Sequence, residues 1–371
     1  MHFIVLLSLA VHSCYIGSKV AVSLLALELG ASQSLIGVLA ALYAVAPMML
    51  GVYSGRLTDR IGMRVPLLIG AALTAAAMLC GFVWQNLNAL FATATLMGAA
   101  FVFYNVAVQN LAGAYGRPEH RARNFSMLTI SYSVSTFIGP MIAGFSIDYA
   151  GYGRAFLTFA LLTLIPFAIL TFRPRLTQVE LRKVAPQELR MFDLLRDPPL
   201  RGVILMSGLM VASYELYAFY LPIYGRSAGL SASAIGVIMA TYATATFLSR
   251  FFLPVVMRRM RANEVMFWFM LLSACGFLVL PLLRAQFALM VVSFAIGIGS
   301  GVGQPLSMTL SFERSPAGRT GEVTGLRLTA NNIARIVIPL VSGSLGAAFG
   351  SAPVFWMNAA NLATISWLSR R

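Results

Sequence analysis

The chain has 371 residues, of which 59% are hydrophobic and only 11% are charged, and its formal net charge is +15. Soluble globular domains carry about 25% charged residues, and one soluble core cannot bury so much apolar side chain. The composition therefore excludes an ordinary soluble protein and indicates that the lipid bilayer is the solvent.

The apolar residues come in blocks of about 20, the length that crosses about 30 Å of hydrocarbon as a helix. Helices also satisfy their own backbone hydrogen bonds, as the bilayer requires. We predict an all-α integral membrane protein with twelve transmembrane helices, at 3–27, 33–54, 65–84, 88–113, 124–148, 153–172, 201–224, 231–255, 263–282, 286–310, 322–348 and 352–369. The first is predicted to be a retained helix, because no cationic segment precedes it and no cleavage site of small residues follows it.

One long connection divides the spans into two groups of six. Residues 1–172 are predicted to form an N-terminal bundle, 173–200 a cytoplasmic linker and 201–371 a C-terminal bundle. The linker contains four prolines around a charged amphipathic stretch, Glu188 to Arg196, which predicts a short helix on the membrane surface. We expect the linker to tether the bundles.

The two halves are copies of one another at an offset of 199 residues. Matching positions include Ser34 and Ser233, Gly37 and Gly236, Tyr43 and Tyr242, Gly98 and Gly297, Pro140 and Pro339, Gly144 and Gly343, Gly151 and Gly350, and Phe156 and Phe355. Six crossings return the chain to its starting side, so both bundles have the same orientation and form a pseudo-symmetric pair. Membrane proteins of this design bind their substrate between the halves, near mid-bilayer, which predicts a transporter.

The positive charge is concentrated on one side of the predicted topology. The even-numbered connections and the C-terminal tail hold twenty Lys and Arg residues, whereas the odd-numbered connections hold three. The positive-inside rule places the even connections and both termini in the cytoplasm, and we expect a bacterial inner membrane. The cations are spread over short loops with no domain to present them, so we expect no nucleic-acid partner.

The segment after the second span reads Gly55-Arg56-Leu57-Thr58-Asp59-Arg60-Ile61-Gly62-Met63-Arg64. Its glycines permit a tight turn and a close helix neighbour. The segment resembles the signature loop of the major facilitator superfamily, which lies between spans two and three, and the resemblance extends over the whole chain. It implies a cytoplasmic latch that forms when the inner gate closes, with Gly55, Asp59, Arg60, Gly62 and Arg64 as gating residues. Asp59 corresponds to Arg258 in the second half, so we expect the latch in the first half only.

Span five contains Gly139-Pro140 followed by Gly144, which resembles the Gly-Pro motif of proton-coupled exporters in this superfamily. Proline can bend the helix, and small residues allow a neighbour to approach closely. The match is partial, because Ser135 stands where the fuller pattern has glycine. Ala94 also replaces an arginine that such exporters usually carry in span four, which argues against proton transfer by that route.

Ionisable side chains inside spans are costly unless they are paired or hydrated, so each is a functional candidate. Glu215 on span seven is the one carboxylate predicted at mid-membrane depth. A buried carboxyl group can exchange a proton near neutral pH, as proton coupling requires. Its neighbours Tyr214 and Tyr217 offer hydrogen bonds and cation–π surfaces. A structural ion pair with Lys19 of span one is the alternative, and Lys19 would also offer a docking point for an anionic substrate.

Polar side chains on other spans extend the candidate site. In the superfamily, spans one, four, seven and ten line the cavity, which implies that Asn105, Gln109 and Gln304 face it. The alternative for each amide is a hydrogen bond between helices. On span eleven, Asn331 and Arg335 lie one turn apart on one face. We predict Arg335 as a candidate anion contact.

The sequence thus predicts a secondary transporter of a small organic molecule that works by alternating access, with proton-coupled efflux as the main hypothesis. Uptake of a small organic anion through Lys19 and Arg335 is the alternative, and a non-transporting membrane sensor or scaffold is the hypothesis from another class. We expect no enzyme activity, because the sequence has no phosphate-binding glycine loop, metal-binding cluster or nucleophile–base set. We expect no cofactor or metal, a monomer, and the bilayer, a small-molecule substrate and protons as partners.

Overall fold

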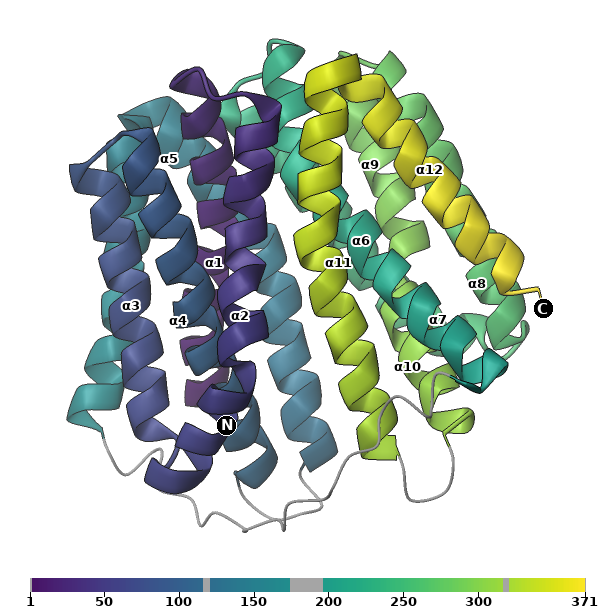
Figure 1. The fold of residues 1–371 in the computed structure, drawn as a ribbon, viewed down its shortest axis with the longest axis horizontal. Coiled ribbons are helices and arrows are strands. Elements are labelled where there is room, and N and C mark those ends of the chain that lie inside the picture. Colours follow the sequence, from purple (N-terminus) through teal and green to yellow (C-terminus); the bar gives the residue numbers. More distant parts are fainter. Residues whose placement is uncertain (1, 116–120, 174–195, 316–319, 371) are drawn as a thin grey trace. The chain divides into compact units, whose positions relative to one another are not determined.

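The computed structural model describes residues 2–115, 121–173, 196–315 and 320–370, and these residues form a bundle of helices (Figure 1). The first half contains α1 (His2–Glu28), α2 (Gln33–Ile61), α3 (Arg64–Val83), α4 (Leu87–Ala114) and α5 (Arg121–Phe172). The second half contains α6 (Pro198–Ser227), α7 (Ala232–Val256), α8 (Ala262–Val279) with the 3₁₀ turn η4 (Leu280–Leu282), α9 (Gln286–Gly301), α10 (Gly303–Glu313), α11 (Thr320–Phe349) and α12 (Ser351–Leu368). The all-α prediction is confirmed.

Helices lie at all twelve predicted crossings within the described residues, although the bounds of several differ from the prediction. Ten stretches of these residues are long and apolar enough to span a membrane; one of them, Arg123–Phe172, contains predicted spans five and six, and α12 is not among the ten. The two spans meet at Gly151, whose φ of 81° lies outside the helical range. The second span runs on to Ile61, and the tenth is divided into α9 and α10 at Val302. The predicted surface helix within 188–196 falls almost entirely outside the described residues.

The contacts divide the chain into two compact units, one of residues 1–185 with 231–240, and the other of 186–230 with 241–371. We refer to them as unit 1 and unit 2. The first turns of α7 therefore pack with unit 1, while the rest of α7 belongs to unit 2. The bundle boundaries at 172 and 201 stay a prediction.

Unit 1 is built on the close approach of α1 and α5. A Cβ added to Gly139 of α5 would lie 2.7 Å from the carbonyl oxygen of Ser13, so only glycine allows this spacing. Two further hydroxyl groups of α5 tie the helices together. Ser131 donates to the carbonyl of Val5 at 3.1 Å, and Ser135 donates to that of Leu9 at 3.2 Å. Small and hydroxyl side chains commonly join helices in this way in membranes.

Unit 2 contains a stabilised break in its tenth span. In a continuous helix the carbonyl of Gly301 would accept from the backbone N–H four residues later, but that residue is Pro305, which has none. The guanidinium Nε of Arg250 on α7 donates to this carbonyl instead, at 3.1 Å. The break between α9 and α10 is therefore compensated by a side chain from a neighbouring helix.

The backbone repeats as the sequence does. Glycines with positive φ occur as the repeat pairs Gly30 and Gly229 (76° and 83°) and Gly151 and Gly350 (81° each). Because L-residues with a side chain rarely adopt this conformation, the same turns had to be built with glycine in both halves. The one further glycine with positive φ among the described residues, Gly62, corresponds to Arg261, so the halves differ at this connection.

Candidate functional site

Glu215 and Arg335 form an ion pair inside unit 2. Arg335 Nε of α11 lies 3.3 Å from Glu215 Oε1 of α6, and the side chain of Glu215 is only 9% exposed while that of Arg335 is 37% exposed. A buried carboxylate is stable in its charged form only beside a partner of opposite charge. Unit 2 therefore supplies its own counter-ion for Glu215. The predicted pairing of Glu215 with Lys19 joins the two units and stays a prediction.

Two tyrosines that neighbour Glu215 in the sequence of α6 pack against α7. Tyr217 is buried and stacks on Tyr242 of α7 with 4.3 Å between ring centroids, and Tyr214 lies 6.2 Å from the same ring. Stacked rings are rigid and offer π faces to a cation or to a flat ligand. The two tyrosines predicted from the sequence thus belong to one aromatic cluster with Tyr242.

The polar side chains of α11 contact neighbouring helices. The Asn331 side-chain amide hydrogen-bonds with the hydroxyl of Ser207 on α6, with 3.0 Å between the two atoms. Arg327, which is buried, donates through Nη1 to Gln304 Oε1 of α10 at 3.4 Å. For Gln304 this contact corresponds to the structural alternative, in which an amide joins two helices, and Asn331 makes a contact of the same kind.

In unit 1, Lys19 of α1 lies over aromatic rings. Its Nζ is 4.9 Å from the ring centroid of Tyr15 and 5.7 Å from that of Tyr43, distances at which a cation is attracted to a π face. Tyr15 in turn stacks on Phe101 of α4 at 3.9 Å. The hydroxyl of Tyr43 donates to Ser18 Oγ at 3.1 Å, which fixes the second ring. The half-buried ammonium group is thus held in a rigid aromatic setting.

The predicted amides of α4 lie in different surroundings from each other. Asn105 is half-buried and accepts a hydrogen bond from the hydroxyl of Tyr132 on α5, at 2.7 Å, whereas Gln109 is exposed. His12, which the sequence gave no reason to select, packs on Tyr132 with 4.6 Å between ring centroids. His12 and Tyr15 are three residues apart, so helical spacing places them on one face of α1, and this pattern could have identified His12 from the sequence.

The sequence predicted a loop for the signature segment, but Gly55 to Ile61 form the last turns of α2, and Arg64 already begins α3. Gly62 ends the helix with φ of 84°, and its N–H donates to the carbonyl of Thr58 at 3.0 Å, so the predicted tight turn is confirmed. Among the residues that the structure describes, a Cβ added to Gly55 would meet nothing within 4 Å, so none of them requires glycine at this position. Arg60 is exposed, and the side chain of Asp59 lies outside the part of the chain that the structure describes.

Arg64 joins the start of α3 to the end of α5. Its Nε donates to the carbonyl of Leu170 and its Nη2 to that of Thr171, both at 3.1 Å. The last carbonyls of a helix lack partners and carry partial negative charge, so a guanidinium satisfies both needs. The latch role of this segment stays a prediction.

The Gly-Pro motif contacts two neighbours within unit 1. Gly139 faces α1, as described above, while a Cβ added to Gly236 of α7 would lie 2.6 Å from the carbonyl of Pro140. Gly144 lies equally close to the first residues of α7. One turn further, the carboxylate of Asp148 accepts backbone hydrogen bonds from Ala232 at 3.0 Å and Ser233 at 2.7 Å. A carboxylate at a helix N-terminus is a favourable cap.

Within the described ranges, no group of three or more His, Cys, Asp and Glu residues is placed to hold a metal ion. A duplicated bundle of membrane-spanning helices, with ionisable side chains inside several spans, is the architecture of a membrane transporter. The sequence profile of the Major Facilitator Superfamily matches residues 3–339. The chain belongs to the major facilitator superfamily and is a multi-pass membrane transporter, not an enzyme.

Two known proteins are similar to this chain in sequence, and a solved structure is similar to it in fold. The chain is 22% identical over 346 residues to the quinolone resistance protein NorA of Staphylococcus aureus (strain MRSA252), covering 91% of this chain and 87% of that protein. It is 26% identical over 318 residues to the uncharacterized MFS-type transporter YfkL of Bacillus subtilis (strain 168), covering 81% and 77%. Among solved structures, the nucleoside transporter NupG has a TM-score of 0.83 at 14% identity, covering 99% of this chain and 98% of that one.

Proposed function

We propose that this protein is a secondary active transporter that exports a small organic molecule in exchange for protons across a bacterial inner membrane, with both termini in the cytoplasm. The observation that carries the proposal is the ion pair between Glu215 and Arg335 inside the membrane-spanning part of unit 2. A carboxylate that is 9% exposed has few ways to reach water, so its protonation and pairing states are linked to the conformation of its surroundings.

Exchange follows from competition for one carboxylate. In the charged state, Glu215 is held by Arg335 and can also attract a cationic or polar group of a substrate. Protonation removes the negative charge, weakens the ion pair and releases the substrate. Because the proton and the substrate favour different states of the same residue, transport of one drives transport of the other in the opposite direction. The tyrosines beside Glu215 would contact the apolar part of the substrate.

The relatives support export of a drug-like compound. NorA of Staphylococcus aureus is described as a quinolone resistance protein and aligns with 91% of this chain. The Gly-Pro motif of α5 is in agreement with this direction of transport. A non-transporting sensor on the same fold is disfavoured by membership in a family of transporters.

The test is proton-driven transport of a labelled quinolone by purified protein in proteoliposomes. We expect Glu215→Gln to abolish the dependence of transport on a pH gradient, because an amide cannot exchange the proton. Glu28→Gln is the matched control, since Glu28 is an exposed acid at the end of α1 and its loss should leave coupling unchanged. Full pH-gradient dependence in Glu215→Gln would overturn the role of this residue.

Uptake of a small organic anion is the second candidate, because Lys19 and Arg335 place one cation inside each unit. Counterflow of labelled anions would detect it. Lys19→Ala should then raise KM for the anion or stop its binding, whereas removal of the exposed Arg226 should have no such effect. Unchanged counterflow in Lys19→Ala would exclude a substrate contact there.

A further inference from the structure

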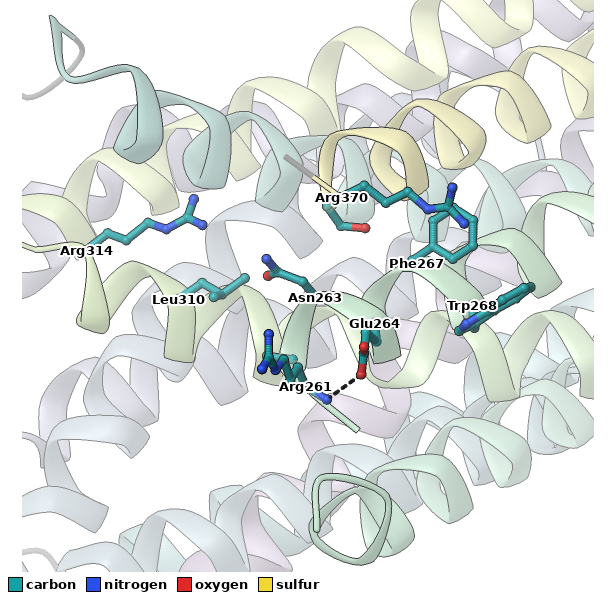
Figure 2. A pocket seen from close by; sticks show the side chains of 10 residues that line it. Arg261, Asn263, Glu264, Phe267, Trp268, Leu310, Arg314 and Arg370 are labelled. Atoms are coloured by element: carbon teal, nitrogen blue, oxygen red, sulfur yellow. Dashed lines mark hydrogen bonds between the residues drawn. The ribbon is translucent and has the colours of Figure 1, made fainter. Parts of the chain in front are cut away.

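Unit 2 contains a basic pocket at one end of its helices. The pocket has a volume of about 610 Å³ and is lined by the start of α8, the end of α10 and the end of α12 (Figure 2). Its lining includes Arg261, Asn263, Phe267, Arg314 and Arg370. The ends of these helices lie on the side of the membrane that the arginine distribution predicts to be cytoplasmic.

The repeat explains why a pocket exists at this place. Asn263 corresponds to Arg64, and residues 369 and 370 correspond to Leu170 and Thr171, the two residues whose carbonyls Arg64 binds in unit 1. In unit 1 the long guanidinium side chain therefore bridges the ends of two helices. In unit 2 the shorter Asn263 stands at the same position and lines an open pocket.

A second difference between the halves involves Arg314, which lines the pocket. In unit 1, Tyr115 at the end of α4 packs edge-on against Phe3 of α1, with 5.6 Å between ring centroids. In unit 2, Arg314 stands in place of Tyr115 and Gly202 in place of Phe3. A charged side chain therefore replaces one ring, and no side chain replaces the other. Among the described residues, a Cβ added to Gly202 would meet nothing within 4 Å, so no close contact replaces the packing of the two rings at this position.

The lining carries a net positive charge. Three arginines, one from each of the converging segments, are opposed by a single acid, Glu264. The carboxylate of Glu264 accepts the backbone N–H of Arg261 at 2.9 Å in the first turn of α8, so part of its charge is balanced by the helix N-terminus. Figure 2 shows Asn263 with the three arginine side chains around it. This arrangement suits an anion with several acceptor oxygens.

The aromatic residues of the pocket indicate that the anion is part of a membrane lipid. Trp268 is 55% exposed on the outer face of α8, and the guanidinium of Arg370 lies 3.7 Å from the ring centroid of Phe267. Tryptophan at the end of a membrane helix marks the level of lipid headgroups. Basic pockets between helices at this level bind the headgroups of anionic lipids.

We propose that this pocket binds the phosphate of an anionic phospholipid from the cytoplasmic leaflet. Arg314 and Arg370 contact the phosphate oxygens, and the acyl chains extend along α8 past Trp268. The site is distinct from the Glu215 region and does not depend on the direction of transport or on the substrate.

The experiment is lipid titration of the purified full-length protein in detergent, followed by native mass spectrometry, with phosphatidylglycerol as the probe. Each arginine that contacts the lipid phosphate should contribute about a fivefold increase in affinity, so Arg314→Gln with Arg370→Gln should weaken the tightest phosphatidylglycerol binding by about 30-fold. The matched control removes the exposed Arg258 and Arg259, which do not line the pocket, and should change that affinity by less than about threefold. Equal losses in the two double variants would overturn the proposal in favour of diffuse surface charge.

Asn263→Arg gives a second test that does not depend on removing charge. This variant restores the arginine of unit 1, so it should fill the pocket and weaken phosphatidylglycerol binding although it adds a positive charge. Unchanged or tighter binding would contradict a site in the pocket.

Two further arms identify the source of the phosphate. Zwitterionic phosphatidylethanolamine should bind at least about tenfold more weakly, and soluble glycerol phosphate should not compete. Competition by glycerol phosphate at similar affinity would overturn the lipid assignment.

Discussion

Arg335 on α11 lies 3.3 Å from the carboxylate of Glu215 on α6, so the acid predicted to carry protons has a counter-ion within its own unit. The sequence suggested Lys19, which is in the other unit, as its structural partner. Within unit 2, Glu215 is paired with Arg335, and within unit 1, Lys19 lies over the rings of Tyr15 and Tyr43.

The Glu215–Arg335 pair predicts a measurable coupling energy. We expect Glu215→Gln and Arg335→Gln to be non-additive, with an interaction of about 1 kcal/mol in the free energy of unfolding. The value is well below that of a fully buried pair, because Arg335 is 37% exposed and partly screened by solvent. Unfolding in detergent of the two single variants and the double variant provides the measurement. Additive effects would mean that the pair contributes nothing to stability.

Two glycines of unit 1 should respond in opposite ways to alanine. Gly139→Ala places a Cβ 2.7 Å from the carbonyl of Ser13, so it should destabilise the protein by about 1–3 kcal/mol. Gly55→Ala meets nothing within 4 Å and improves helix propensity, so stability should be unchanged or slightly higher. Thermal unfolding of both variants in the same detergent tests this. Equal destabilisation would show that the tight α1–α5 contact is not what requires glycine at 139.

Asp148 should protect the first residues of α7 from hydrogen exchange. Asp148→Ala removes the acceptor of the N–H groups of Ala232 and Ser233, so exchange at these amides should accelerate by about fivefold, the equivalent of about 1 kcal/mol. Ser32→Ala is the control, because Ser32 caps the N-terminus of α2 through the N–H of Leu35. That variant should change exchange at α2 and leave α7 as it is. Unchanged exchange at 232 and 233 in Asp148→Ala would contradict the cap.

Arg64 and its repeat counterpart should differ in their effect on stability. Arg64→Ala leaves the carbonyls of Leu170 and Thr171 without the guanidinium, and should cost about 1 kcal/mol, a reduced value because Arg64 is half-buried. Asn263→Ala removes no such bridge and should cost less than about 0.5 kcal/mol. Thermal unfolding of the two variants compares them directly. Similar costs would imply that the bridge seen in unit 1 is not stabilising.

The helices could be predicted from the sequence because the bilayer imposes one simple rule. A block of about 20 apolar residues must be a helix, and the repeat fixes the number of blocks in each half. The exceptions are local. The second span continues to Ile61 because polar residues such as Thr58 and Arg60 are acceptable in a helix that extends beyond the hydrocarbon. The break at Val302 depends on Pro305, four residues after Gly301, and on the hydrogen bond that Arg250 of α7 donates to Gly301. Neither feature can be read from the hydropathy of the segment.

The candidate residues could be selected from the sequence, but their partners could not. An ionisable residue in an apolar block is conspicuous by itself, so Glu215, Lys19 and Arg335 were all identified. Which of them are adjacent depends on how the helices are rotated and packed, and a single sequence carries little information on rotation. His12 was not selected from the sequence, because its packing on Tyr132 of α5 depends on how α1 and α5 are rotated toward each other.

The unequal positions Arg64 and Asn263 have a consequence for how the protein has changed since its duplication. When a gene segment is doubled, every structural brace is present twice, and the fold can survive the loss of one copy. Arg64 still bridges its helix ends, whereas at the second copy Asn263 lines a pocket that also contains three arginines. Because helices already surround this pocket, a ligand that regulates the protein can bind there without changes in the residues proposed for transport.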